Sequence, residues 1–223
     1  MERSEYFNRQ IKLWGEKRQE TLKNKKILIV GAGGLGSSLS YALGTSGIGK
    51  IDIVDFDRVS ISNIHRQIAF NLEDKESYKA EVIAKRVREK SPFVEITPYI
   101  MSFKDFLLLN RRYDLILDAT DNIETRREID NFSKSSNTPW IYGSVEEFNG
   151  QVCFFDRGSF DIFNIKGHRL GGVHASIVMY IASIQANLAI RYLLGLNIVK
   201  DRLYYIYFDR DGDLVLQKFN IPI

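Results

Sequence analysis

Short apolar runs alternate with segments of helical periodicity along the chain before Gly150. Lys26–Val30 is a continuous, β-branched apolar run, which is typical of a strand buried on both faces. Leu35–Ser46 follows with apolar residues at helical spacing, and Lys50–Val54 is the next apolar run. Strands that alternate with helices predict an α/β fold, with a Rossmann-like, mainly parallel sheet and helices on both faces.

The same alternation continues beyond this first unit. Helices are expected at Tyr78–Lys90, Phe103–Leu109 and Glu124–Ser135, and strands at Val94–Ile100, Asp114–Asp118 and Trp140–Tyr142. Because every further strand is separated from the last by a helix, these elements extend the predicted parallel sheet.

After Gly150 the pattern becomes that of antiparallel strands. Strands are expected at Gln151–Phe155, Leu203–Phe208 and Leu214–Phe219, with a hairpin turn at Arg210–Asp213. The long apolar helix Val173–Gly195 lies between them. Since neither a repeat nor a linker interrupts the chain, we expect residues 1–223 to form a single domain. Its parts are a helical arm (1–25), a nucleotide-binding half (26–145) and a second half (146–223) in which antiparallel strands extend the sheet.

A glycine turn follows the first predicted strand. Gly31 permits a tight bend, Gly33 lets backbone approach a phosphate, and Gly36 lets the next helix pack closely on the strand. Gly34 belongs to the same predicted nucleotide-binding turn. Asp55 follows at about the twenty-residue spacing of an acid that binds a ribose hydroxyl. Glycines also make ordinary turns, but the strand, helix and acid around these predict nucleotide binding.

Polar side chains crowd the positions after the second predicted strand. Asp57, Asn63, Arg66 and Gln67 follow it closely, and arginine is well suited to bidentate contacts with phosphate. Lys79 begins a predicted helix, where its ammonium group can reach the same phosphates. A lysine in that place is equally compatible with a surface position of no function.

Asp121 follows another predicted strand, Asp114–Asp118. Its carboxylate is suited to holding Mg²⁺ against a polyphosphate. The alternative is that Asp121 caps the helix that begins near Glu124. The residues alone do not separate these two roles.

Composition limits the classes of protein that remain. The net charge of +3 is too mild to argue for a nucleic-acid partner. A single cysteine, Cys153, excludes an intrachain disulfide framework and a zinc site built from paired cysteines. The start of the chain has no apolar signal core, and polar residues interrupt the apolar stretch Ile177–Leu196. We therefore expect a soluble, cytoplasmic protein with no membrane partner.

Six motifs together resemble those of the ThiF/MoeB/HesA family, which includes the adenylation domains of ubiquitin-activating enzymes. In order they are Asn8–Gly15, Gly31–Gly36, Asp55–Asn63, Arg66-Gln67, Lys79 and Asp118–Asn122. The resemblance covers the chain from Tyr6 to about Phe219. It implies an adenylyltransferase that uses ATP and Mg²⁺ to adenylate the C-terminal glycine carboxylate of a small ubiquitin-like protein, releasing pyrophosphate.

The resemblance also assigns roles at the nucleotide. Asp55 would hold the ribose of ATP, and Asn63, Arg66 and Lys79 would hold its phosphates. Asp121 would bind the catalytic Mg²⁺.

Three further residues complete the site that the resemblance implies. Arg9 matches an arginine that reaches the ATP of the other subunit in bacterial homodimers, which implies a homodimer here. Asp57 and Gln67 would support the site. The attack of a weak carboxylate nucleophile on phosphorus needs charge neutralisation and alignment, which fits these residue types.

The implied partners are a small β-grasp carrier protein ending in Gly-Gly, of the ThiS or MoaD type, and a separate sulfur donor. The second half of the chain, 146–223, would bind the carrier. The aromatic run Tyr204–Phe208, together with Phe154 or Phe155, is a candidate docking surface.

The chain departs from many family members in its cysteines. It lacks the two Cys-x-x-Cys pairs of their structural zinc site, so no zinc is expected. The segment Asp156–Gly172 also lacks the cysteine that many members carry there, and Cys153 lies in an apolar strand as a buried structural thiol. The chain is therefore expected to form an adenylate without a covalent transfer through its own thiol.

The three histidines give no strong signal. His168 and His174 flank a turn, but no further metal ligands accompany them, so we expect them to be solvated. His65 is compatible with a place near the nucleotide or with simple packing.

Several functions remain open. Adenylation of a sulfur carrier in thiamine biosynthesis is favoured over the molybdopterin pathway. A cyclising dehydratase that acts on a tRNA base also lacks the zinc pairs, although the Asn8–Gly15 motif fits carrier activation better. A nicotinamide-dependent oxidoreductase would explain only the glycine turn and Asp55. A pseudo-enzyme that only binds a carrier is less favoured, because it would leave the complete set of ATP-site residues without a use.

Overall fold

The computed structural model describes residues 2–165 and 171–223. The strands are β1 (Lys26–Val30), β2 (Lys50–Val54), β3 (Glu95–Tyr99), β4 (Leu115–Asp118), β5 (Trp140–Glu146), β6 (Asn149–Phe155), β7 (Arg202–Phe208) and β8 (Leu214–Asn220). The α-helices are α1 (Arg3–Tyr6), α2 (Asn8–Trp14), α3 (Glu16–Leu22), α4 (Gly34–Gly44), α5 (Ile61–Ile64), α6 (Lys79–Lys90), α7 (Phe103–Leu107), α8 (Ile123–Ser136) and α9 (Ala175–Leu193). Two short 3-10 helices are η1 (Leu72–Asp74) and η2 (Phe160–Phe163).

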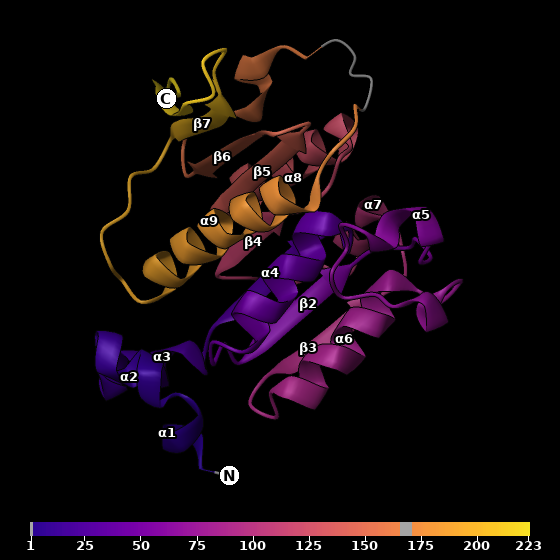
Figure 1. Cartoon of the computed structure of the whole chain (residues 1–223). Helices are drawn as coiled ribbons and strands as arrows, with labels where there is room; N and C mark the ends of the chain where they lie inside the picture. The colour runs from indigo at the N-terminus through magenta and orange to yellow at the C-terminus, as the bar shows by residue number, and fades with distance from the viewer. Residues whose placement is uncertain (1, 166–170) are drawn as a thin grey trace.

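One sheet of eight strands runs through the molecule in the order β3-β2-β1-β4-β5-β6-β7-β8 (Figure 1). Neighbouring strands from β3 to β5 are parallel, whereas β5 to β8 pair antiparallel. The predicted architecture, a mainly parallel sheet extended by antiparallel strands, is confirmed.

Both faces of the parallel strands are buried. Along β1, Ile27 and Ile29 join a core under α4, α6 and α9, whereas Leu28 and Val30 join a second core under α7 and α8. Successive side chains of a strand point to opposite faces, so a strand covered on both sides must be apolar at every position. This is why the continuous apolar runs located these strands in the sequence.

Several predicted boundaries shift by one or two residues, and two differences have a clear structural cause. β5 continues past Tyr142 to Glu146, because Gly143–Glu146 pairs antiparallel with β6 although its residues are less apolar. The helix α9 begins at Ala175 and not at Val173, because Val173 forms a bridge with Glu147 and His174 caps the helix.

The N-terminal arm lies at the amino ends of the strands (Figure 1). The guanidinium of Arg3 donates to the Gly47 carbonyl at 3.0 Å, and the Gly49 amide donates to the Leu22 carbonyl at 2.9 Å. Gly47 and Gly49 lie just before β2. These contacts therefore place α1–α3 beside the amino ends of the strands, at the end of the sheet opposite to their carboxyl ends.

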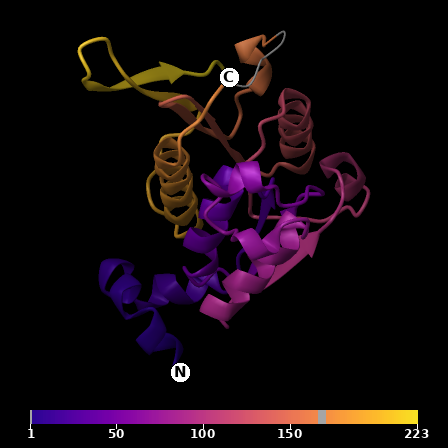
Figure 2. The same cartoon turned by 45° about the vertical axis from the view of Figure 1, so that its right-hand side comes forward.

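The hairpin of β7 and β8 forms one edge of the sheet and projects from the body (Figure 2). Phe208 is exposed, but Phe154 and Phe155 on β6 are fully buried, so the prediction that either contributes to a docking surface is wrong. The reason is that β6 lies inside the sheet, where Phe154 packs on Tyr192 and Phe155 on Trp140. Cys153 on the same strand is buried, as predicted.

No helix in the described ranges has the length and apolar character needed to cross a membrane.

Candidate functional site

A cavity of about 410 Å³ opens at the carboxyl ends of β1, β2 and β4. Ligands of open parallel sheets bind at this edge, where the strand order reverses between β1 and β4. Most of the predicted site residues line this cavity: Gly31, Gly33, Gly34, Asp55, Asp57, Arg66, Gln67, Lys79 and Asp121. Its apolar lining includes Val54, Met101, Phe103 and Ala119.

The glycine turn is required by close backbone approaches. Gly31 has φ of 98°, and a Cβ there would lie 2.6 Å from the Ala119 carbonyl oxygen. Gly36 does not line the cavity; a Cβ at that position would lie 2.1 Å from the carbonyl oxygen of Gly31. The turn can therefore bring the start of α4 against the cavity only with glycine at both positions, and it places the first amides of the helix where an anion can bind.

Asp55 is bonded to the glycine turn. Its Oδ2 accepts a hydrogen bond from the Ala32 amide at 2.6 Å, and its Oδ1 accepts one from the Asp57 amide at 2.7 Å. Burial raises the pKa of this carboxyl above its ordinary value, and the two amides and the Lys79 ammonium oppose part of the rise. A carboxylate oxygen has more than one acceptor site, so both oxygens can still accept from a ligand hydroxyl.

Lys79 is the first residue of α6. Its position in the sequence was also compatible with a place on the surface, but the side chain is buried. Its side chain is 7% exposed, and its Nζ lies 2.8 Å from Oδ2 of Asp57. The Asp57 side chain is 54% exposed, so the pair joins a buried cation to a carboxylate at the mouth of the cavity. A polyphosphate entering the cavity would meet this ammonium group.

Arg66 reaches the cavity from the turn after α5. Its Nη2 donates to Oδ1 of Asn63 at 3.0 Å, and its Nη1 lies 2.9 Å from Nε2 of His65. Asn63 does not line the cavity, so within this chain it orients Arg66. Neighbouring Gln67 is buried, and its Oε1 has no hydrogen-bond partner in the described part of the chain, which suits contact with a polar ligand.

Asp121 lines the cavity with an exposed carboxylate. It does not cap the next helix, because Oδ1 of Asn122 accepts from the amides of Glu124 at 2.8 Å and Thr125 at 3.1 Å. Among the described residues, no group of three or more His, Cys, Asp or Glu side chains is placed to hold a metal ion. A single carboxylate is nevertheless a sufficient protein ligand for Mg²⁺ when phosphates and water supply the rest.

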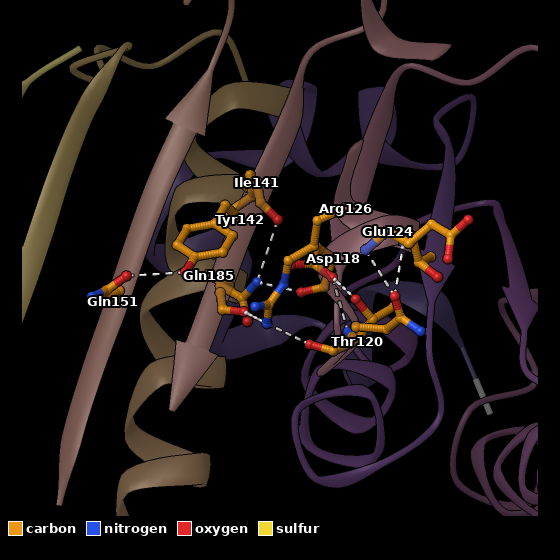
Figure 3. A network of polar contacts seen from close by, with 11 residues as sticks. Asp118, Thr120, Glu124, Arg126, Ile141, Tyr142, Gln151 and Gln185 are labelled. Atoms are coloured by element: carbon orange, nitrogen blue, oxygen red, sulfur yellow. Dashed lines mark hydrogen bonds and ion pairs between the residues drawn. The ribbon is translucent and has the colours of Figure 1, made fainter. Parts of the chain in front are cut away.

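Arg126 lines the cavity but was not among the site residues predicted from the sequence. Figure 3 shows it between Asp118 and Tyr142, where its Nε donates to Oδ2 of Asp118 at 3.0 Å and its guanidinium lies 5.0 Å from the Tyr142 ring centre. Burial raises the pKa of the Asp118 carboxyl, and the charge of Arg126 opposes that rise. Ile123 and Ile129 lie three residues to either side of Arg126, and this helical spacing was the available signal for its burial.

Arg9 does not line the cavity of its own chain. It is exposed on α2, in the arm at the opposite edge of the sheet. Its predicted role at the nucleotide of another subunit is compatible with this place and stays a prediction.

The histidines are placed as follows. His174 caps α9, where its Nδ1 accepts from the Ser176 amide at 3.3 Å, and His65 contacts Arg66. His168 lies outside the described residues.

The fold and the site define an α/β protein whose cavity, at the carboxyl ends of parallel strands, is lined by Arg66, Lys79 and Asp121 beside a glycine turn. The ThiF family model matches residues 7–213, and the chain belongs to this family. It is 31% identical to the molybdopterin-synthase adenylyltransferase of Escherichia coli over 203 residues, which cover 85% of this chain and 82% of that protein. It is 36% identical to the sulfur carrier protein adenylyltransferase of Thermus thermophilus over 143 residues, or 63% of this chain and 53% of the relative.

Solved structures share the fold. A crystal structure of Escherichia coli MccB with ATP has a TM-score of 0.81 at 21% identity, and covers 92% of this chain and 65% of that chain. The chain spans only about half the length of several curated relatives, including the Thermus thermophilus protein at 53%.

Proposed function

We propose that this protein adenylates the C-terminal glycine carboxylate of a small ubiquitin-like sulfur-carrier protein, using ATP and releasing pyrophosphate. The observation that carries the proposal is the convergence of Arg66, Lys79 and Asp121 on one cavity beside the glycine turn. Relatives with the names sulfur carrier protein adenylyltransferase and molybdopterin-synthase adenylyltransferase support it. The nicotinamide alternative accounts for none of these three side chains.

The reaction forms a bond between a carboxylate oxygen and the α-phosphorus and breaks the bond to the pyrophosphate oxygen. The nucleophile is already ionised, so no general base is needed. Arg66 and Lys79 would offset the charge that develops on the phosphates, with Asn63 orienting Arg66. Asp55 would hold the ribose, and Gln67 would offer its unpartnered Oε1 and its amide to the nucleotide.

Mg²⁺ fits the donor set. The exposed carboxylate of Asp121 is a hard oxygen ligand at the cavity, as Mg²⁺ requires, and the nucleotide phosphates would complete the coordination. When bound, the ion would neutralise phosphate charge and favour departure of pyrophosphate.

A homodimer would complete the site. Arg9 lies at the far edge of its own sheet, and only in an assembly can the Arg9 of the partner subunit reach this cavity. In a symmetric dimer each subunit would supply this arginine to the other.

The second half of the chain, 146–223, would bind the carrier. Glu146 and Gly171 line the cavity, so this half borders the place where a carboxylate tail must arrive. The exposed apolar side chains of the projecting hairpin, Phe208, Leu214, Leu216 and Phe219, suit a protein partner.

Sulfur would come from a separate donor. Burial raises the pKa of the Cys153 thiol well above its ordinary value, so the thiol is not a ready nucleophile. The segment Asp156–Gly172 contains no cysteine. The carrier adenylate would therefore react with a thiol of another protein, either while bound to this enzyme or after its release.

The thiamine pathway was favoured from sequence, but the relatives' names do not distinguish it from the molybdopterin pathway. Intact-mass spectrometry after incubation with Mg-ATP separates them, using a ThiS-like and a MoaD-like carrier in parallel. We expect one of these carriers to gain an adenylyl group, and the same carrier without its last glycine to gain none.

Two outcomes would contradict the proposal. One is that neither carrier gains an adenylyl group although the enzyme binds ATP. The other is ATP turnover that depends on tRNA and not on a carrier, which would favour the cyclising dehydratase.

A further inference from the structure

The sheet divides at the edge of the cavity. Strands β4 and β5 pair only through Ile116 with Trp140 and Leu117 with Ile141. After Asp118 the chain leaves the sheet and lines the cavity with Ala119, Thr120 and Asp121, whereas β5 continues to Glu146 alongside β6. Backbone carbonyls near this divergence lose their strand partners, and buried carbonyls need others.

Two buried side chains replace the lost strand pairing (Figure 3). Nε2 of Gln185, from α9, donates to the carbonyls of Asp118 at 2.8 Å and Ile141 at 3.4 Å. Nη2 of Arg126, from α8, donates to the carbonyl of Gly143 at 3.1 Å and to that of Thr120. Both side chains therefore join β4 or the turn that follows it to β5.

Arg126 fixes the backbone directly before Asp121. One face of its guanidinium lies over Tyr142, Nε binds the Asp118 carboxylate, and Nη2 holds the Thr120 carbonyl. Thr120 is bonded to the same carboxylate, since its amide and its hydroxyl both donate to Oδ1 of Asp118. On the other side of Asp121, Asn122 is held as the cap of α8.

We propose that Arg126 is a positioning residue for the adenylation reaction: its guanidinium holds the Asp118–Asn122 turn and so sets the place of the Asp121 carboxylate at the cavity. This inference rests on the proposed function of the site. The role requires the planar fork of arginine, because a lysine ammonium cannot bind a carboxylate and two carbonyls in these directions.

The first test compares Arg126→Lys with the wild-type protein in steady-state ATP–pyrophosphate exchange. We expect kcat to fall by about 10²-fold, since a small misplacement of a catalytic group has an effect of that order. The KM for ATP should stay within about threefold, because the residues expected to bind the nucleotide are unchanged. Arg88→Lys is the matched control: Arg88 also joins a helix to a strand carbonyl, that of Ile96, but lies outside the cavity, and its exchange should stay at the wild-type rate.

A double-variant cycle separates positioning from general stability. If Arg126 acts through Asp121, the variant Arg126→Lys/Asp121→Asn should exchange no more slowly than Asp121→Asn alone. Losses that multiply in the double variant would overturn the proposal, and so would a wild-type kcat in folded Arg126→Lys.

A second variant covers the case in which Arg126→Lys does not fold, as the loss of a buried charge partner can cause. Asp118→Asn/Arg126→Gln replaces the ion pair by a neutral pair of similar size. It should fold and show the same loss of kcat; a folded form with wild-type kcat would overturn the proposal. If wild-type protein itself shows no exchange with any carrier, the proposed function fails, whereas wild-type exchange with an unaffected Arg126→Lys contradicts only the role of Arg126.

Discussion

The carboxylate of Asp55, at the end of β2, accepts a hydrogen bond of 2.6 Å from the amide of Ala32 in the glycine turn after β1. The acid predicted to bind the ribose thus also fixes the loop predicted to bind phosphate. If the predicted ribose contact is correct, ribose binding and the shape of the turn depend on one side chain, and we expect them to fail together.

Asp55→Asn should weaken both. The asparagine amide nitrogen cannot accept a hydrogen bond, so one of the two backbone amides, Ala32 or Asp57, loses its partner. We expect the free energy of unfolding to fall by about 1–3 kcal/mol and the KM for ATP to rise. Urea unfolding and exchange kinetics measure the two effects. A variant with reduced stability and an unchanged KM would argue against contact with the nucleotide.

The same carboxyl gives stability a pH dependence. Because burial raises the folded-state pKa of Asp55, the folded protein keeps a proton that the unfolded chain releases above the ordinary pKa of 3.8. Protons bound in the folded state exceed those in the unfolded state over this interval, so the contribution of Asp55 to stability falls as the pH rises from 3.8 to the raised pKa. The difference in the free energy of unfolding between wild type and Asp55→Asn, measured by urea titration, should therefore shrink as the pH rises through this range; a constant difference would contradict the assignment.

Lys79 and Asp57 should differ in their effects on the reaction. Lys79→Ala removes a buried cation that is expected to contact phosphate, and we expect kcat to fall on the order of 10²–10³-fold. Asp57→Asn leaves that cation in place and should change kcat far less, because Asp57 is largely exposed. Exchange assays at saturating ATP compare the two, and equal losses would indicate that the ion pair, not the lysine, is required.

The predicted exchange of Arg9 between subunits has a direct test by mixing. Arg9→Ala and Asp121→Ala proteins should each be inactive. After co-refolding, about half of the dimers contain one subunit of each kind, and each of these has one complete site out of two. We expect recovery to about a quarter of wild-type exchange. If Arg9 acts within its own chain, or not at all, mixing restores nothing beyond the activity of the separate variants.

Cys153 should be chemically silent in the folded protein. Burial raises the pKa of its thiol, so at neutral pH the thiol stays protonated and inaccessible to alkylating reagents. We expect labelling by iodoacetamide only in denaturant, and unchanged carrier adenylation by Cys153→Ala. Rapid labelling under native conditions would reopen a role for this thiol.

The fold was predictable from sequence because β1, β2 and β4 are buried on both faces, which forces continuous apolar runs on them. The end of β5 was not predictable in this way. Gly143 interrupts the apolar run because a Cβ there would lie 2.4 Å from Nε2 of Gln185, a residue forty-two positions away. Tertiary contacts of this kind leave no local periodicity.

The site was predictable to the extent that its residues follow strand ends. Asp55 and Asp121 follow β2 and β4, and each lines the cavity as predicted. Lys79, at the start of a helix, lines the cavity too, but only the family resemblance favoured a role for it over a surface position. The choice between cap and cavity roles for Asp121 was not predictable, because adjacent Asn122 is an equally good cap in sequence. Arg126 was missed because it lies in a helix rich in charged residues, where the spacing of Ile123 and Ile129 was the sole sequence signal for its burial.

ATP–pyrophosphate exchange with purified protein and a β-grasp carrier ending in Gly-Gly tests the central claim most directly. Labelled pyrophosphate should enter ATP in the presence of Mg²⁺ and the intact carrier, and the label should not be incorporated when the carrier lacks its terminal glycine or when Asp121→Ala replaces the wild type. Absence of exchange with both ThiS-like and MoaD-like carriers, or exchange that proceeds equally well in Asp121→Ala, would contradict the account.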